Sequence, residues 1–492
     1  MSSLDVFSYL SCPDISAFSR AGRRRISMNH QNISRENYQT YVWFRKAAEL
    51  GDAYAQFNLG LMYKKGEGIE RDYAAAFKWL RQAAQQGLAF AQNHLGALYY
   101  NGRGVEKSDP EAAYWFRHAA DQGDASAQQN LGQMYRKGRG VEQNYDMALA
   151  WFYRAAEQSV ASAQNLLAEC YLYGHGATVN YPLAMAWFRK AAVQGDSQAQ
   201  LNLGLMYKRG LGVEASDAQA LCWFRQAAAQ GDPMAQRHLG VAYADGLGVR
   251  ADPLRAVAWL QRAGDQGDRE AQFHLGVILS SGQGVDQDEA RALGWYLRSA
   301  KQGHMLAQYN LGSMYANGRG VGRDEQRALE WYRRAADQGA ANAQFNLGVA
   351  CANGHGVPRD DARAAQWYKL AAEQGDASAQ NNLGVMYANG QGVPRDDALA
   401  VYWYGKAAEQ GHALAQYNLG GMYDSGRGVP RDTVRSYMWM LLAAEGGDET
   451  ASASKSIVAR RLSPTEIGSA LDLTRQWQVS HAGIAPTGPR AG

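Results

Sequence analysis

Apolar and polar positions alternate along most of the chain with the spacing of α-helices. In residues 52–87, Ala55, Leu59 and Met62 are four and three positions apart, so a helix would place them on one face. Asp52 precedes this stretch and is a typical helix N-cap, and a pair of glycines follows it. The pattern predicts one helix that ends in a glycine-containing turn.

A second helix is predicted in the same stretch. Asp72 is its expected N-cap, Ala76, Trp79 and Ala83 form its apolar stripe, and Gly87 closes it. The stretch therefore predicts a helix–turn–helix pair, with small residues where the helices approach each other. One such pair cannot bury its apolar face alone, so neighbouring pairs must stack.

The same pattern recurs every 36 residues without insertion or deletion. A glutamine column and a pair of glycines keep this register eleven times. The sequence therefore predicts an all-α protein, an α/α superhelical solenoid of about eleven helix–turn–helix repeats. Tryptophan marks the period most clearly, at positions 43, 79, 115, 151, 187, 223, 259, 295, 331, 367, 403 and 439.

The ends of the chain depart from the repeat. Ser463-Pro464-Thr465-Glu466 has the pattern of a capping box, which predicts a helix that seals the last repeat. The first 35 residues are predicted to be a disordered basic leader. Two other interpretations of this leader stay open, an organellar targeting segment and a translation start at Met28. The predicted order is a disordered basic leader (1–35), an N-terminal half-repeat (36–51), the solenoid (52–447), C-terminal capping helices (448–479) and a disordered tail (480–492).

Composition narrows the class of protein. The net charge is +3, and the Arg-rich leader accounts for this surplus, so the neutral body disfavours nucleic acid as a partner. We find no apolar run of the roughly 20 residues that a membrane helix needs. The four cysteines are far apart, which suits a reducing compartment and favours a cytoplasmic location.

The repeat resembles the Sel-one-like repeat family, a relative of the tetratricopeptide repeats. The resemblance extends over about residues 36–447 and implies an α/α superhelix that acts as an adaptor in assembling complexes. A cysteine-rich subgroup of that family is associated with β-lactam hydrolysis, but its regular paired cysteines are absent here. The residues of the first repeat that carry the resemblance to the family are Ala55, Gln56, Leu59, Gly60, Tyr63, Gly66, Gly68, Ala76, Trp79, Ala83, Ala84 and Gly87.

Some columns of the first helix vary from repeat to repeat and share one helical face, opposite the Ala/Leu/Met stripe. In tetratricopeptide-like superhelices this face lines the concave groove, so we expect a partner protein or peptide, with an acidic stretch, to bind there. The alternative is that the aromatic rings pack on adjacent helices and that the cations are solvated. The candidate groove residues are Phe57, Lys64, Lys65, Arg136, Lys137, Lys208, Arg209, Arg237, Phe273, Tyr309, Phe345 and Tyr417, and all five aromatic positions among them are expected to be exposed.

No motif predicts catalysis, a cofactor or a metal. His238 and His274 occupy equivalent positions in adjacent repeats, but two histidines without a third ligand are a weak metal site. The glycine pairs recur as connectors, with no preceding strand to make a phosphate loop. The sequence thus predicts a non-enzymatic protein–protein interaction scaffold without a cofactor. Two alternatives remain, an enzyme such as a β-lactam hydrolase and a spacer that binds through its ends.

Overall fold

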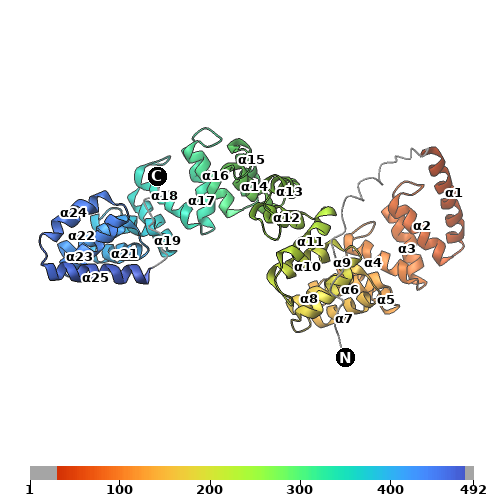
Figure 1. Ribbon diagram of the computed structural model, residues 1–492. Helices are drawn as coiled ribbons and strands as arrows, with labels where there is room; N and C mark the ends of the chain where they lie inside the picture. The colour runs from red at the N-terminus through yellow and green to blue at the C-terminus, as the bar shows by residue number, and fades with distance from the viewer. Residues whose placement is uncertain (1–29, 482–492) are drawn as a thin grey trace, which may run out of the picture. The chain divides into compact units, whose positions relative to one another are not determined.

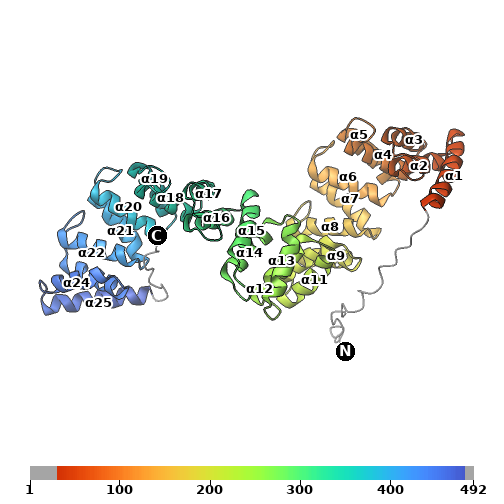
Figure 2. The ribbon, with the colours of Figure 1, turned by 90° about the horizontal axis from the view of Figure 1, so that it is seen from above.

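The computed structural model describes residues 30–481, and within that range it consists of 25 helices with no strand. The helices from α2 to α23 form eleven consecutive pairs, each with a first and a second helix, which confirms the predicted helical solenoid (Figure 1). Residues up to Trp259 form one compact unit and residues from Leu260 form another. Within each unit, successive helix pairs stack on one another (Figures 1 and 2).

The bounds of the helices repeat with the sequence. The first helices are α2 (Ala53–Lys65), α4 (Ala89–Asn101), α6 (Ala125–Lys137), α8 (Ala161–Tyr173), α10 (Ser197–Arg209), α12 (Pro233–Asp245), α14 (Arg269–Ser281), α16 (Met305–Asn317), α18 (Ala341–Asn353), α20 (Ala377–Asn389) and α22 (Ala413–Ser425). The second helices are α3 (Tyr73–Gln85), α5 (Asp109–Asp121), α7 (Tyr145–Glu157), α9 (Tyr181–Val193), α11 (Asp217–Ala229), α13 (Pro253–Asp265), α15 (Glu289–Lys301), α17 (Glu325–Asp337), α19 (Asp361–Glu373), α21 (Asp397–Glu409) and α23 (Thr433–Glu445).

The expected caps begin and end these helices. The Asp52 side chain accepts a hydrogen bond from the Ala55 amide at 2.6 Å, and Asp72 accepts one from Ala74 at 2.8 Å. Gly66 ends α2 in the left-handed conformation with φ 76°, where a residue with a Cβ is strained. Contacts local to each helix therefore define where it begins and ends.

The predicted apolar stripes are buried, but the largest core side chain stands at a position that the sequence analysis overlooked. Ala55, Leu59 and Met62 of α2 are buried, as predicted. The residue after the tryptophan of each second helix from α3 to α23, such as Phe116 or Phe152, is also buried. Its ring lies under the glycine of the first helix, where a Cβ on Gly132 would come within 2.7 Å of the Phe152 ring. The glycine column is therefore explained by packing against this ring.

The tryptophan column lies at the edge of the core, which corrects the expectation of a uniformly buried stripe. Trp151 is 6% exposed, whereas Trp79 is half-buried and Trp43 is 64% exposed. Trp115 packs against the cluster that contains Ala84 and Leu95. The Trp115 ring thus covers α3, the preceding second helix, and α4, the first helix of its own repeat. Trp43 is exposed because no second helix precedes α1 (His30–Glu49) among the described residues.

The buried glutamine column joins three successive helices. Gln200 of α10 donates its amide to the Ala192 carbonyl of α9 at 3.0 Å. Its oxygen accepts a hydrogen bond from Gln230, which follows α11, at 2.9 Å. The same relay recurs through most repeats. A buried amide with both groups satisfied links the repeats at little desolvation cost.

The two ends differ from the predicted boundaries by a few residues. Helix α1 begins at His30 rather than near residue 36, because no glycine or proline interrupts the sequence there. Helix α24 (Glu449–Ala459) precedes α25 (Pro464–Ser480), which has the predicted capping box and ends one residue past the predicted boundary at 479. Trp477 of α25 packs edge-on to Trp439, with ring centroids 6.2 Å apart. The predicted leader up to residue 29 and the tail from residue 482 lie outside the described residues.

Candidate functional site

Side chains of successive first helices contact one another along one side of the solenoid. We call this the first-helix face, and it consists of positions 54, 57, 58, 61, 64 and 65 of α2 and their equivalents every 36 residues. In the first unit, Asn130 of α6 donates to Asn93 of α4 at 3.0 Å, and Asn202 of α10 donates to Asn165 of α8 at 3.2 Å. In the second unit, Asn418 donates to Asn381 at 3.0 Å. These hydrogen bonds join the first helices of adjacent repeats, and Asn165, Asn202 and Asn381 are buried within the contact.

The aromatic column of this face is half-buried, which corrects the expectation that it is exposed. The Phe273 ring stacks on His304 with centroids 4.4 Å apart, and the Phe345 ring lies 5.9 Å from Tyr368. Phe57 and Tyr417 are also partly buried. The rings are partly covered by side chains of their own repeat, such as Tyr368 beside Phe345, and of the next repeat, such as His304 beside Phe273. These aromatic rings therefore pack on adjacent helices, as the alternative interpretation predicted. Their role in binding stays a prediction.

The rings beneath the aromatic column are tyrosines in the second unit. Tyr332 lies 5.8 Å from Tyr309 between ring centroids. Burial raises the pKa of Tyr332 to about 12, and Tyr309 adds to this effect. The Tyr296 hydroxyl lies 3.1 Å from the Ser280 hydroxyl of α14. These tyrosines stay neutral and contribute hydrogen-bonding groups beneath the face. Their position next to each tryptophan would have revealed them in the sequence.

The predicted cations differ in how they are paired. Arg136 of α6 forms an ion pair with Glu169 of α8 at 2.9 Å, so its charge is already matched. Lys137, Lys208 and Arg209 are exposed, and Arg237 is half-buried. The structure therefore separates a cation whose charge is matched by an acidic partner from cations that are exposed.

Lys64 has a different partner. Its ammonium lies 3.2 Å from Nδ1 of His94 on α4, and the His94 ring stacks on Phe57 with centroids 5.6 Å apart. Burial lowers the pKa of His94 to about 4, and Lys64 and Lys65 lower it further. At neutral pH His94 is therefore uncharged, and its Nδ1 accepts a hydrogen bond from Lys64. Burial also lowers the pKa of Lys64, and so do Arg103 and Lys65.

Two exposed aromatic side chains lie on the same face and were not among the predicted site residues. Tyr54 of α2 is 65% exposed and Phe90 of α4 is 58% exposed. They occupy equivalent positions in the first two repeats, whereas the next two repeats have Ser126 and Ser162 there. Comparing this column along the chain would have identified them. Exposed rings of this size are typical anchors in protein interfaces.

The family model of the Sel1 repeat matches twelve segments of the chain. They are residues 33–52, 53–88, 89–124, 125–160, 161–196, 197–232, 233–268, 269–304, 306–339, 341–376, 377–412 and 413–448. The chain belongs to the Sel1 repeat family. This confirms the resemblance that the sequence suggested, and Sel1 repeat proteins are generally protein-interaction scaffolds, mostly without enzymatic activity.

Two solved Sel1 repeat structures are similar to the chain. One is c5321 of uropathogenic Escherichia coli, described as a protective antigen with an SLR fold. It is 38% identical, with a TM-score of 0.78 over 91% of this chain and 95% of that one. The other is a Sel1 repeat protein from Oxalobacter formigenes, 32% identical, with a TM-score of 0.51 over 66% of this chain and 93% of that one. No curated protein sequence matches the chain.

Histidines of this Sel1 repeat protein have structural partners. His304 Nδ1 accepts a hydrogen bond from the Ala307 amide at 3.1 Å and so caps α16, while its Nε2 lies 3.0 Å from Glu270. His238 stacks on Phe224 with centroids 4.8 Å apart. Between residues 30 and 481, no three His, Cys, Asp or Glu side chains are grouped as a metal site would require. No helix in the same range is long and apolar enough to span a bilayer.

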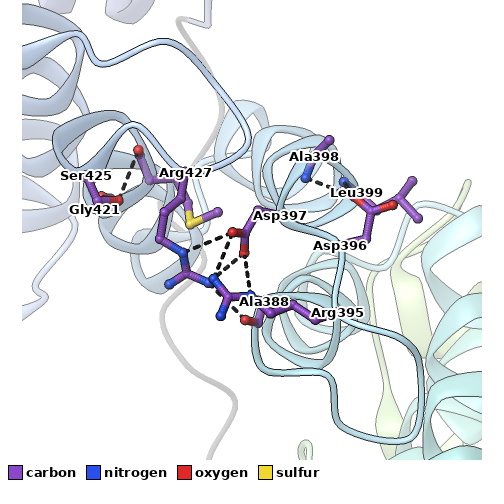
Figure 3. Close-up of polar contacts among 10 residues, drawn as sticks. Ala388, Arg395, Asp396, Asp397, Ala398, Leu399, Gly421, Ser425 and Arg427 are labelled. Carbon is purple, nitrogen blue, oxygen red and sulfur yellow. Dashed lines mark hydrogen bonds and ion pairs between the residues drawn. The ribbon is translucent and has the colours of Figure 1, made fainter.

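A connector near the C-terminal end carries an ion-pair network of one carboxylate and two arginines. Arg427, between the two glycines that follow α22, donates to Asp397 at the start of α21 through Nη2 at 2.6 Å and Nε at 3.2 Å (Figure 3). Arg395 donates to the same carboxylate at 2.9 Å. These hydrogen bonds from Arg427 and then Arg395 lower the pKa of Asp397 to about 2. The pairing joins successive repeats and explains why these charges are not free for a partner.

Proposed function

We propose that this Sel1 repeat protein is a non-enzymatic scaffold that binds a segment of a partner protein along its first-helix face. The observation that carries the proposal is the continuity of this face from one repeat to the next, combined with its change in chemistry along the chain. Constant columns serve the packing between repeats, while side chains of the variable columns contact one another along the first-helix face. A surface of this kind suits a partner segment that crosses several repeats.

Contacts between neighbouring first helices support this continuity. The Ser162 hydroxyl of α8 donates to Gln129 of α6 at 2.6 Å, about two helical turns from the Arg136–Glu169 ion pair. Phe57 and Phe90 lie 6.4 Å apart between ring centroids, across α2 and α4. Each contact joins side chains from two repeats. Side chains held in this way lose less conformational freedom when a partner binds.

Site-specific photo-crosslinking tests the proposal. A photoreactive phenylalanine analogue is placed at Tyr54 or Phe90, on the first-helix face, and at Tyr114 or Tyr153, on second helices. Tyr114 is 54% exposed and Tyr153 is 46% exposed, so they are matched in accessibility to the first pair. We expect a partner in native lysate to crosslink to the first pair and not to the second.

Three results would contradict this function. Crosslinks only at Tyr114 and Tyr153 would move binding to the second helices. Crosslinks from probes in α1 and α25 alone would favour a spacer that binds through its ends. Turnover of the chromogenic β-lactam nitrocefin by the purified chain would favour an enzyme.

The proposed setting is the cytoplasm, with no nucleic acid as partner, and this rests on the separated cysteines and the balanced charge. Burial raises the pKa of the free Cys170 thiol to about 11, which keeps it protonated and unreactive. Fractionation of cells that express the chain tests its location. Recovery of the chain mainly with an exported fraction would refute the cytoplasmic assignment.

A further inference from the structure

Four side chains on α2 and α4 form a row of contacts from an exposed ring to a cation. Phe90 lies 6.4 Å from Phe57 between centroids, Phe57 stacks on His94 at 5.6 Å, and His94 lies 3.2 Å from the Lys64 ammonium. The row lies within the first unit and joins two repeats. One end offers apolar surface and the other end offers positive charge.

The positive end has no acidic counterpart for Lys64. In the part of the chain that the structure describes, the only hydrogen-bonding partner of the Lys64 side chain is His94, and the charged groups that act on it are Arg103 and Lys65. Arg136, in the same column, pairs with Glu169 instead. A half-buried ammonium beside other cations is destabilised, and a carboxylate that binds there would relieve this strain.

The apolar end is also without cover. Tyr54 is 65% exposed and Phe90 is 58% exposed, and they occupy equivalent positions of α2 and α4. Positions 54 and 64 are separated by about 15 Å along a helix, at 1.5 Å per residue. An extended segment of about five residues spans this distance. The spacing between the two ends therefore sets the spacing of the groups that they would recognise.

We infer that α2 and α4 form a binding site for a short acidic–apolar segment of a partner protein. Its carboxylate binds Lys64, beside Arg103 and beside Lys65, which itself pairs with Glu67 at 3.3 Å, and an apolar side chain about five residues away packs on Tyr54 and Phe90. The inference rests on the proposed function and locates its strongest binding in the first two repeats. Charge complementarity selects the acidic residue, and the exposed rings select the apolar one.

A second place in the first unit has similar residues but a different arrangement, and it provides the control. Lys208 and Arg209 of α10 occupy the same columns as Lys64 and Lys65, and His238 matches His94. Leu201, however, stands where Phe57 does and is buried, and His238 stacks on Phe224. The row from exposed ring to cation is therefore absent there.

Peptide selection against the full chain tests the inference. Phage-displayed random dodecapeptides are selected on the wild type, and the enriched peptides are then measured by fluorescence anisotropy. We expect Asp or Glu about five residues from Leu, Phe or Trp. Lys64→Glu/Lys65→Glu should weaken these peptides at least about tenfold, and Lys208→Glu/Arg209→Glu less than about twofold, because only the first pair borders the exposed rings. Circular dichroism checks that both variants stay helical.

A second measurement reports on the site itself. The pKa of His94, about 4 in the free chain, should rise when a selected peptide places a carboxylate beside Lys64, because this offsets the charge of Lys64 while the burial that is the larger cause remains. NMR of histidine-labelled protein, assigned with His94→Gln, follows this change. Phe90→Ser should weaken the peptide and leave the His94 pKa of the free chain unchanged.

The outcomes separate this inference from the proposed function. If the selected peptides bind both double variants equally, or contain no acidic residue, the inference is overturned while scaffold binding elsewhere on the face stands. If no peptide is enriched and Tyr54 and Phe90 give no crosslink, both proposals fail. Binding of a single-stranded RNA probe with the same Lys64 dependence, in place of the acidic peptides, would also overturn the inference.

Discussion

The second glycine of each connector should tolerate a side chain far less well than the glycine that closes each repeat. Gly140 and Gly123 have positive φ values, 66° and 95°. A Cβ at Gly123 would meet no atom within 4 Å, whereas a Cβ at Gly140 would overlap the Asp109 carbonyl and lie 2.6 Å from the Pro110 nitrogen. The two positions share the left-handed backbone and differ in the space around it.

The expected costs follow from this difference. Alanine in the left-handed region costs about 1–2 kcal/mol at either position. At Gly140 the start of α5 must also move, which adds about 1–3 kcal/mol by analogy with overpacked cores. Arg139, which donates to Asp109 through Nε and Nη2 at 3.0 Å each, would be displaced as well. Gly140→Ala should therefore destabilise the repeats around it by about 1–3 kcal/mol more than Gly123→Ala does.

Native-state hydrogen exchange measures this locally, which suits a repeat protein whose unfolding is not a single step. Amides of α5 and α7 should lose at least about fivefold more protection in Gly140→Ala than in Gly123→Ala. Helix α11, two repeats from α7, provides the internal reference. Equal loss of protection in the two variants would refute the argument, because it would show that backbone conformation alone decides the cost.

Three further changes test other parts of the fold. Ser159 is the one non-glycine residue with positive φ among those described, so Ser159→Gly should stabilise the chain by about 1 kcal/mol in urea unfolding, and a loss of stability would contradict this. Gln200→Ala should cost about 1–3 kcal/mol because it leaves a buried carbonyl unpaired, whereas the exposed Gln198→Ala should be nearly neutral in the same assay. The depressed pKa of Asp397, about 2, means that its ionised form stabilises the fold above pH 4 and that this contribution is lost as pH falls from about 4 toward 2. Carboxyl NMR titration should find this pKa closer to its ordinary value in Arg427→Gln, and no rise would show that the ion pair is not its cause.

Periodicity predicted the fold because packing repeats along this chain. Asp52, Asp72 and the glycine that ends α2 act through contacts with their own helix, so their roles could be read from neighbouring sequence. The sealing helix at Ser463 was predictable for the same reason. The burial of Phe152 was missed because the adjacent tryptophan column is more conspicuous, although it lies at the edge of the core.

The surface was harder to predict because each exposed position depends on residues of the next repeat. Phe273 occupies a column that faces away from its own helix pair's apolar stripe, yet His304 and Tyr296 cover part of its ring. Arg136 looks equivalent to Lys64 in the sequence, and only contact with the following first helix separates them. Comparing one position across the repeats therefore shows which face of the helix a side chain occupies. It does not show which residues of the next repeat contact that side chain.

Because a charge on one repeat is paired by a residue of the next repeat, one substitution in the next repeat should cancel the charge of the candidate site. Glu169 stands 33 residues after Arg136, and Ala97 stands 33 residues after Lys64. Ala97→Glu should therefore copy the Arg136–Glu169 ion pair onto Lys64, raise the pKa of His94 above about 4 and abolish binding of the selected acidic peptides. Ala97→Gln, nearly the same in size, should leave both properties close to the wild type. If Glu and Gln at this position have the same effect, an acidic segment does not bind through the unmatched charge of Lys64.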